Sequence, residues 1–530
     1  MQHPSPEARD PKTKRAQSVR LIAGLIVAMA GIAALVAGFY RLHGENVGLT
    51  VTRTMVGTTP VTVFAPKNGE RAPVVVVAHG FAGSQQLMQP FATTLARNGY
   101  IAVTFDFLGH GRNPVPMRGD ITEGLTITSA LLRELGEIAS YARTLPTSDG
   151  RLAVLGHSMA SDIVVRFAQA HPETQATVAV SVFSPVVTAD NPRNLLVIVG
   201  AIEPSMLSDE GLRIVNLTAG GKAIAGETYG KFGDGTARRL VLARGVEHIG
   251  VLYSQDSMTA ALDWLNSAFT RQSSGGIDRR GLSLALVFLG LIALAWPLTR
   301  LLPVTISVPA GANLPWRPLL IAAAIPAILT PLILWKLPTD FLPILLGDYL
   351  ALHFAIYGLM TAAAIYYLDS NSAQFGVHRR APTIRWKAIG IAVFVLTIYQ
   401  IAAFGYPIDH YVFSFYPIPA RVPVMATIAC GTIIYFIADE WLTRGAQAKR
   451  GAYALTKFSF LLSLTIAVLL NPQKLFFLAI IVPAILLLFL AFGLISQWSY
   501  RATRHPLPGA IANAAVFAWA IAVTFPMIVR

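Results

Sequence analysis

The stretch Leu152-Ala153-Val154-Leu155-Gly156-His157-Ser158-Met159-Ala160 decides how the first half of the chain is interpreted. It joins an apolar run of strand length to a Gly-x-Ser-x-Ala turn, and a segment with helical spacing of apolar residues follows. A serine on such a strand-to-helix turn is held in a strained conformation with its hydroxyl above the sheet. The turn closes only when the flanking residues are small, as Gly156 and Ala160 are. An ordinary serine in a strand-to-helix loop is the alternative against which the rest of the chain is weighed.

The composition divides the chain into two parts with different surroundings. Of 530 residues, 54% are hydrophobic and only 13% are charged, which is too apolar for one ordinary soluble domain. Apolar runs long enough to cross a membrane occur at residues 21–40 and repeatedly after residue 280, whereas residues 50–270 have normal polarity. The formal charge of +14 does not indicate nucleic-acid binding, because Lys and Arg cluster at the ends of the apolar runs. The single cysteine, Cys430, excludes an intrachain disulfide and a cysteine-type metal site.

The N-terminal segment has the pattern of a membrane anchor. Residues 1–20 form a polar tail that is rich in Lys and Arg. Residues 21–40 contain no charge, and they exceed the apolar length of a cleaved signal peptide, which is about 7 to 15 residues. We therefore expect an uncleaved signal anchor rather than a removed leader. The basic flank predicts a cytoplasmic tail and an extracytoplasmic position for the segment that follows.

Between residues 48 and 270 the sequence predicts a parallel sheet covered by helices. Residues 48–66 alternate between apolar and polar side chains around Gly57, which predicts an entry hairpin. Helical patterns such as 128–145 and 160–170 separate most of the later strand candidates. This alternation predicts an α/β architecture with right-handed crossovers. The strand candidates are short continuous apolar runs, typical of strands buried on both faces, at residues 74–78, 101–105, 152–155, 178–182, 195–199 and 240–242.

Three loops in this region resemble those of the α/β-hydrolase family. The first long strand ends in His79-Gly80-Phe81, like the family's His-Gly oxyanion turn. The next ends in Asp106-Phe107-Leu108-Gly109-His110-Gly111, close to the family's Asp-x-x-Gly-x-Gly loop. The turn at residues 156–160 follows at the expected strand. Residues 48–270 therefore resemble the serine hydrolases of this family, such as esterases and dienelactone-hydrolase-like members, fused here to a polytopic membrane domain.

The resemblance implies a catalytic triad in the chain order Ser, acid, His. Ser158 would be the nucleophile, and a hydroxyl at neutral pH needs a base within hydrogen-bond reach. His248, just after the last predicted strand, is the predicted base because an imidazole titrates near neutrality. Glu203, just after the preceding strand, is the predicted acid that orients the imidazole. Asp209 and Glu210 lie a turn or two downstream and stay open as alternative acids.

The same resemblance implies an oxyanion hole formed by the backbone N–H groups of Phe81 and Met159. The His, Asp and Glu residues show no recognisable metal-ligand spacing, so we expect no metal and no cofactor. About ten residues separate the strand runs 178–182 and 195–199. Many lipases and peptidases of the family carry a cap domain at this point, and the chain has no room for one.

Residues 271–280 are predicted to form a short polar linker, and residues 281–530 an all-α membrane domain of about eight transmembrane helices. Threading the helices from a cytoplasmic N-terminus puts the basic loops at 379–387, 444–450 and 501–504 inside, as the positive-inside rule requires. We therefore expect a multi-pass protein of the cell's inner membrane whose hydrolase-like domain is extracytoplasmic. The predicted spans are 281–298, 318–335, 349–368, 388–405, 422–438, 453–470, 475–495 and 510–529.

Ionisable residues in or beside these spans are functional candidates, because charge is costly in lipid. Asp348 and His353 lie in one span, and Asp409 and His410 lie in the following outer loop. The four could converge on the side that faces the hydrolase-like domain, and helix-packing hydrogen bonds are the alternative. Lys457 lies within another span, where we expect it to extend toward the surface.

A second resemblance occurs at Asp439-Glu440-Trp441-Leu442-Thr443-Arg444, which is similar to the Glu-Glu-x-x-x-Arg motif of the membrane-embedded CAAX-type endopeptidases. That family also needs histidines in later spans. Only His505 follows here, in a predicted loop, so we interpret the match as coincidental.

The sequence thus predicts a membrane-anchored, extracytoplasmic serine hydrolase that cleaves carboxylic esters, including lipid esters, through an acyl-enzyme. Acyl transfer, thioester hydrolysis and peptide hydrolysis stay open, because they differ only in acyl acceptor and pocket shape. A non-catalytic sensing module coupled to a membrane domain is the alternative from another class. The expected partners are a small-molecule or lipid ester and the lipid bilayer. The substrate's identity and the oligomeric state are not determined by the sequence.

Overall fold

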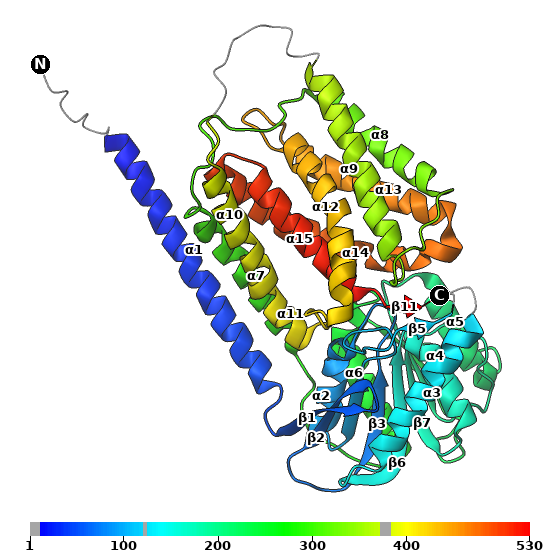
Figure 1. Cartoon of the computed structure of the whole chain (residues 1–530). Coiled ribbons are helices and arrows are strands. Elements are labelled where there is room, and N and C mark those ends of the chain that lie inside the picture. The colour runs from blue at the N-terminus through cyan, green and yellow to red at the C-terminus, as the bar shows by residue number, and fades with distance from the viewer. Residues whose placement is uncertain (1–10, 120–123, 371–382, 530) are drawn as a thin grey trace, which may run out of the picture.

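The computed structural model describes residues 11–119, 124–370 and 383–529, which form an α/β domain and a bundle of apolar helices (Figure 1). The first ten residues of the predicted basic tail lie outside the described residues, as do Arg379 and Arg380 of a predicted inner loop. The α/β domain sits against one end of the bundle, and the last described residues return to it (Figure 1).

The α/β domain is built on a nine-stranded sheet with the order β1-β2-β4-β3-β6-β7-β8-β10-β9. β2 is antiparallel to β1 and β4, β9 is antiparallel to β10, and the strands from β4 to β10 are parallel. The predicted mostly parallel sheet is confirmed, and β1 and β2 form the entry hairpin. The strands are β1 (Leu49–Val56), β2 (Thr59–Pro66), β3 (Ala72–Ala78), β4 (Ile101–Phe105), β6 (Ser148–His157), β7 (Thr174–Val180), β8 (Leu195–Gly200), β9 (Thr228–Tyr229) and β10 (Arg238–Ala243).

Helices cover both faces of this sheet because alternate strand residues point to opposite sides. Val75 and Val77 of β3 join a buried cluster with α2 and α6, whereas Val74 and Val76 join a cluster with α3 and α4. α5 packs beside β8 and β10 in a third cluster. These helices are α2 (Gln89–Arg97), α3 (Gly124–Arg143), α4 (Met159–Ala170), α5 (Ser205–Ala219) and α6 (Gln255–Phe269).

Nine helices among the described residues are long and apolar enough to cross a membrane. They correspond to the predicted anchor and the eight predicted spans. The fifth span is composite, because α10 (Trp386–Ile398) continues through a π-helical stretch, Tyr399–Phe404, into α11 (Gly405–Tyr411). The other helices are α1 (Pro11–Gly44), α7 (Arg280–Thr299), α8 (Trp316–Leu334), α9 (Gly347–Ser370), α12 (Val422–Thr443), α13 (Ala452–Leu470), α14 (Pro472–Thr503) and α15 (Leu507–Thr524).

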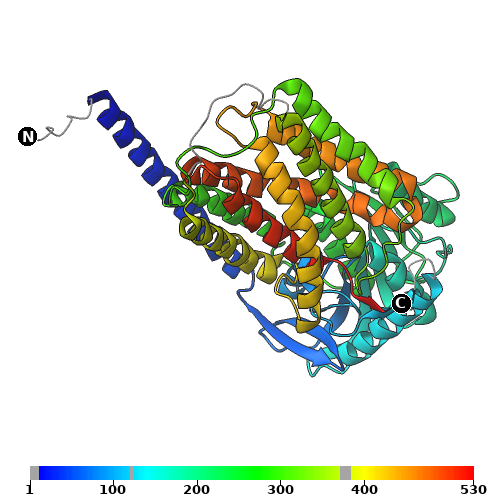
Figure 2. The same ribbon diagram turned by 45° about the horizontal axis from the view of Figure 1, so that its top comes forward.

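The N-terminal helix α1 lies at the outer side of the bundle and packs along α7 (Figure 2). Glycines allow the two backbones to approach closely. A Cβ placed at Gly31 would lie 3.1 Å from the carbonyl oxygen of Gly290, and one placed at Gly38 would lie 2.9 Å from that of Ser283. Small residues at a helix interface are the usual means of close packing between helices in lipid. The predicted anchor is therefore an integral part of the helix bundle.

The α/β domain is bonded to the bundle at several places. The last strand, β11 (Ile528–Val529), pairs in parallel with β5 (Met117–Arg118), so the chain end completes a small sheet on the α/β domain. At the start of α7, the Arg280 guanidinium forms a buried ion pair with Asp278 at 2.8 Å and donates to the Thr93 hydroxyl of α2, also at 2.8 Å. The paired Arg280 is thus accommodated at the domain junction, although it lies at the edge of a predicted span.

Candidate active site

Ser158 lies between β6 and α4 on a strained turn. Its φ of 55° and ψ of −119° fall in a region of backbone conformation that residues other than glycine rarely adopt. Its N–H donates to the Val180 carbonyl at 2.8 Å, which fixes the turn against the neighbouring strand. A Cβ at Gly156 would lie 2.3 Å from the Ala160 carbonyl oxygen, so only glycine fits there. The local sequence therefore creates the sharp turn that was predicted around Ser158.

The structure brings Ser158, His248 and Glu203 together at the carboxyl ends of the parallel strands. His248 Nε2 lies 3.0 Å from Ser158 Oγ, and His248 Nδ1 lies 2.6 Å from Glu203 Oε2. The Glu203 side chain is fully buried, and that of His248 is 18% exposed. A serine hydroxyl, an imidazole and a carboxylate in this order form a relay that can deprotonate the serine.

The Glu203 carboxylate is held by two further hydrogen bonds. Its Oε1 accepts from the Gly200 N–H at 2.7 Å and from the Ser181 hydroxyl at 2.8 Å. Ser181 itself has a φ of 55°, a second strained position next to the site. Sequence reasoning did not single out Ser181, since a serine after an apolar strand carries no distinctive signal.

The two alternative acids have other surroundings. Asp209 is exposed on α5. Glu210 is buried, but it accepts a hydrogen bond from the Ser184 N–H at 3.1 Å and pairs with Arg213 at 2.7 Å. Among the three candidate acids, the described geometry therefore joins Glu203 to the imidazole.

The loop after β3 comes close to Ser158. The Gly83 N–H donates to the Gly80 carbonyl at 3.1 Å, which closes the turn that contains Phe81. A Cβ at Gly80 would lie 2.9 Å from the Ser158 Cβ, so glycine permits this approach. Met159 is the first residue of α4, where a backbone N–H has no acceptor within the helix. The backbone of Phe81 and of Met159 therefore lies beside the serine.

Three buried histidines surround the triad as structural groups. His79 Nε2 accepts from the Phe107 N–H at 3.1 Å, and His157 Nε2 donates to the His248 carbonyl at 2.9 Å. Burial lowers the pKa of His79, although the nearby Asp106 carboxylate opposes this effect. Burial also holds the pKa of His110 and of His157 well below the ordinary value. Neutral imidazoles thus connect the site loops, and His157 fixes the loop that carries His248.

The helix bundle contacts the loop beside Ser158 directly. The Phe81 ring stacks on Phe477 of α14 with centroids 4.1 Å apart, and it lies 6.4 Å from the Phe525 ring, just after α15. Arg421, at the start of α12, donates to the Gly109 carbonyl at 2.7 Å. Sequence reasoning missed these contacts, because each of them joins residues more than 300 positions apart.

A polar contact between the two parts lies at Asp409. Its carboxylate forms an ion pair with Arg112 of the α/β domain at 2.5 Å. His410 instead bonds within its own helix, to the Tyr406 carbonyl at 2.9 Å. His353 is fully buried inside the bundle, where its ring lies against Phe460 at a centroid distance of 5.3 Å. Asp409 therefore serves the junction, whereas His353 has an aromatic environment.

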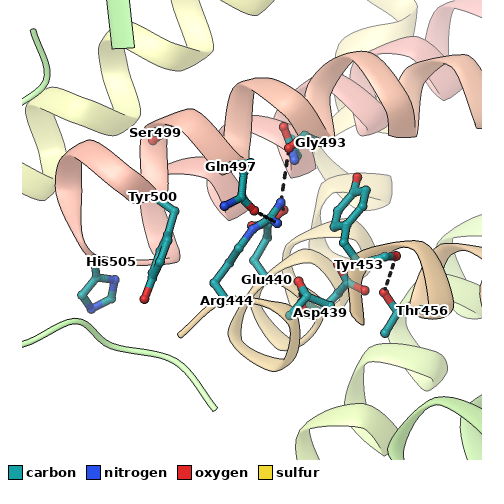
Figure 3. Close-up of polar contacts among 12 residues, drawn as sticks. Asp439, Glu440, Arg444, Tyr453, Thr456, Gly493, Gln497, Ser499, Tyr500 and His505 are labelled. Atoms are coloured by element: carbon teal, nitrogen blue, oxygen red, sulfur yellow. Dashed lines mark hydrogen bonds and ion pairs between the residues drawn. The ribbon is translucent and has the colours of Figure 1, made fainter. Parts of the chain in front are cut away.

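The bundle also contains a buried ionic cluster far from Ser158 in the sequence (Figure 3). Arg444 pairs with Glu440 at 2.8 Å and donates to the Gln497 side chain, and Lys457 pairs with Asp439. Lys457 is thus buried in an ion pair, and our expectation that it extends toward the surface is wrong. Figure 3 shows His505 lying apart from both carboxylates. In the part of the chain that the structure describes, no group of three or more His, Cys, Asp or Glu side chains has a metal-binding arrangement.

A protein-family model matches part of the α/β domain. The family model described as "Serine aminopeptidase, S33" matches residues 69–209. A search of curated proteins finds no match.

Three similar solved structures are a Pyrobaculum calidifontis esterase, an Anabaena variabilis dienelactone hydrolase and a membrane phospholipase A described as a bacterial virulence factor. The esterase has a TM-score of 0.33 and 16% identity over 51% of this chain and 95% of its own. The dienelactone hydrolase has a TM-score of 0.28 and 16% identity over 43% and 98%. The phospholipase has a TM-score of 0.31 and 12% identity over 49% and 99%. The sheet order, the serine turn and the family match lead to one conclusion: the chain contains an α/β-hydrolase domain.

Proposed function

We propose that this protein is a membrane-embedded serine hydrolase that cleaves carboxylic esters through an acyl-enzyme. One observation carries the proposal, namely the hydrogen-bonded series from Ser158 Oγ through both nitrogens of His248 to the buried Glu203 carboxylate. A structural serine has no need of an imidazole at 3.0 Å whose other nitrogen is held by a buried acid. The same geometry opposes the alternative of a non-catalytic sensing module.

The proposed reaction follows from the position of each atom. His248 Nε2 takes the proton of Ser158 Oγ as the oxygen attacks the ester carbonyl, and the new C–O bond gives a tetrahedral intermediate. Glu203 stabilises the imidazolium that forms and keeps the proton of Nδ1 in place. His248 then returns its proton to the alcohol as the ester C–O bond breaks. Water repeats the sequence on the acyl-enzyme and releases the acid.

We assign the oxyanion hole to the N–H groups of Phe81 and Met159. Support comes from the close approach of the Gly80 turn to Ser158 and from the position of Met159 at the start of α4. Backbone donors near a developing oxyanion contribute a few kcal/mol each, and the positive end of a helix adds to this stabilisation.

For the membrane part we propose a multi-pass arrangement with the α/β domain outside. The nine apolar helices support insertion. Basic residues at the bundle ends away from the α/β domain support the orientation, because Lys and Arg favour the cytoplasmic side. Described examples are Arg385, Arg444, Lys449, Arg450, Arg501 and Arg504.

The substrate we propose is an ester of an amphiphilic lipid that reaches the site from the bilayer surface. The Phe81 ring, on the turn after β3, stacks on the Phe477 ring of α14, so the site lies next to the membrane part. Exposed apolar side chains lie close to site residues in the sequence: Phe183, two positions after Ser181, is 56% exposed, Ile202, just before Glu203, 65%, and Ile249, just after His248, 38%. An exposed apolar rim is typical of a surface that receives an apolar ligand.

The test uses the full-length protein purified in mild detergent. A fluorophosphonate probe should label the protein, and Ser158→Ala should abolish both labelling and hydrolysis of p-nitrophenyl acetate. Ser208→Ala, which removes an unrelated hydroxyl on α5, should leave both unchanged. Labelling that persists at full strength in Ser158→Ala would refute the assignment of the nucleophile. A panel that includes a thioester and an aminoacyl amide separates esterase activity from the thioesterase and peptidase alternatives.

A second pair of variants tests the lipid substrate. Phe183→Asn should lower hydrolysis of phospholipid in vesicles about 10- to 160-fold, since burying one aromatic ring contributes roughly 1.5–3 kcal/mol, and should spare the short ester. Ile224→Asn is the control, because Ile224 is similarly exposed, at 65%, and lies beyond the end of α5 rather than next to a site residue in the sequence. Equal loss on both esters would indicate damage to the site rather than loss of lipid contact.

A further inference from the structure

A cavity of about 280 Å³ lies between the β1–β2 hairpin and the loop after β3. Seven of its ten lining residues are polar, and Arg53 and Arg112 are among them. The side chains of Gln86 and Gln89 form another part of the wall. This cavity is separate from the triad, and the proposed ester hydrolysis gives it no role.

The cavity lies beside the ends of two candidate membrane spans. Gln86 Nε2 donates to the Asp409 carbonyl at 3.1 Å and Gln89 Nε2 donates to the His410 carbonyl at 3.0 Å, both near the end of the span Trp386–Tyr411. The span that contains α1 ends at Gly44, and β1 begins at Leu49. Figures 1 and 2 both place the β1–β2 hairpin at this end of α1. The cavity therefore lies at the height where lipid headgroups meet the protein.

Of the two arginines that line the cavity, Arg112 is paired with a carboxylate and Arg53, in the described part of the chain, is not. The Asp409 carboxylate is compensated by Arg112 Nη2 at 2.5 Å, and its Oδ1 also accepts from the N–H groups of Phe415 and Tyr416 at 2.9 and 3.0 Å. Arg53 has no carboxylate partner among the described residues and is exposed. The buried Asp106 is occupied as well, because its carboxylate accepts from Gln85 and from the Arg112 backbone N–H.

The remaining hydrogen-bond donors suit an anion. A guanidinium has five N–H donors. Only Nη2 of Arg112 bonds to Asp409, so Nε and Nη1 have no acceptor in the part of the chain that the structure describes. All donors of Arg53 are equally available. Two arginines that line one cavity suit a phosphate, which accepts forked hydrogen bonds from guanidinium groups.

We propose that this cavity binds the phosphate of an anionic membrane lipid, with Arg53 and Arg112 as its donors. The cavity is slightly smaller than the roughly 300–1,000 Å³ of sites that enclose a drug-sized ligand, so it would take the headgroup while the acyl chains stay in the bilayer. Binding there would hold the β1–β2 hairpin against the membrane surface. The proposal does not depend on the esterase activity.

The experiment measures binding of dioleoyl phosphatidylglycerol to the full-length protein in dodecyl maltoside micelles by native mass spectrometry. Arg53→Gln should raise the apparent Kd for this lipid about tenfold, as expected for the loss of a charge-assisted hydrogen bond. Arg53→Lys keeps the charge but loses the fork, and should give a smaller increase. Arg244→Gln is the matched control, because Arg244 is 87% exposed and pairs with Asp256 elsewhere on the domain. The melting temperature of each variant, measured by intrinsic fluorescence, verifies the fold.

Equal affinity of Arg53→Gln and the parent protein would overturn the proposal, as would an equal loss in Arg244→Gln. A parallel titration with soluble sn-glycerol 3-phosphate separates the two possible sources of the phosphate. Failure of this compound to displace the lipid supports a membrane ligand. Displacement at equal concentration would overturn the lipid assignment in favour of a soluble phosphate ester.

Discussion

Replacement of Glu203 by Gln separates the role of the acid from its structural contacts. The Gln side chain has nearly the same shape, and its carbonyl oxygen can still accept from the Gly200 N–H and the Ser181 hydroxyl, which lie 2.7 and 2.8 Å from Oε1. The change therefore affects mainly the atom that faces His248 Nδ1. There an amide N–H replaces a carboxylate oxygen that lies 2.6 Å from the imidazole.

The expected loss follows from burial and from the tautomer of the imidazole. Breaking a buried, hydrogen-bonded charge pair costs about 2–5 kcal/mol, and each 1.36 kcal/mol corresponds to a tenfold change in rate, so kcat/KM should fall roughly 30- to 5,000-fold. The upper part of this range is expected, because an amide N–H that donates to Nδ1 leaves the proton on Nε2. In that tautomer Nε2 is unable to accept the proton of Ser158.

The assay is steady-state hydrolysis of p-nitrophenyl acetate together with the rate of fluorophosphonate labelling. Both should fall by the same factor, since both require an activated Ser158. Asp209→Asn is the matched control, because Asp209 is exposed on α5, and its activity should stay within twofold of the parent protein. The reasoning is refuted if Glu203→Gln keeps more than one tenth of kcat/KM, or if Asp209→Asn shows the larger loss.

Three further outcomes are expected. Phe477→Ala removes the ring stacked on Phe81 and should lower kcat about three- to tenfold with little change in KM, since an aromatic pair contributes roughly 0.5–1.5 kcal/mol; an unchanged kcat would show that the oxyanion turn keeps its position without the bundle. Burial raises the pKa of Glu134 from 4.5 to about 7, so the stability that its protonated form contributes is complete below pH 4.5 and is lost as the pH rises through 7. Glu134→Gln should flatten this fall in the melting temperature of the α/β domain, measured by intrinsic fluorescence between these pH values, and an equally steep fall in the variant would contradict the assignment. In a background without the natural cysteine, Lys231→Cys should react with an impermeant maleimide in spheroplasts and Thr383→Cys should not, and the reverse pattern would place the α/β domain in the cytoplasm.

Local sequence patterns predicted most of the α/β fold, because the burial of a strand and the closure of a tight turn depend on residues that are close in the sequence. Apolar runs such as the one in β3 are buried on both faces, and the structure places each of them in the parallel sheet. The turn at Ser158 was predictable for the same reason, since only small residues permit it. The order of strands then carried Glu203 and His248 to the same edge of the sheet. The mutual position of these three residues is thus a consequence of topology.

The junction between the two parts was not predictable from these patterns. Arg112 and Asp409 are 297 positions apart, and neither has a distinctive neighbourhood in the sequence. Lys457 illustrates the same limit inside the bundle. A lysine in an apolar span suggests extension toward the surface, whereas the carboxylate of Asp439 on a neighbouring helix keeps it buried. Pairings between distant helices depend on the packing of the whole bundle, and hydropathy contains little information about that packing.

The contacts at the junction give a reason for the number of apolar helices, which is larger than a membrane anchor requires. One apolar helix such as α1 is sufficient to hold a domain at a membrane. The bundle instead contacts the loops that follow β3 and β4, two strands on the same side of β6: Phe477 of α14 stacks on Phe81, and Arg421, at the start of α12, donates to the Gly109 carbonyl. β11 also pairs with β5, next to that second loop. In the proposed membrane arrangement, a shift of α14 would therefore move the turn that contains Phe81, beside Ser158, and preorganised donors lose much of their effect when they are displaced by an ångström. Under the proposed mechanism, the helices thus form part of the catalytic unit, and the state of the surrounding lipid can influence its rate.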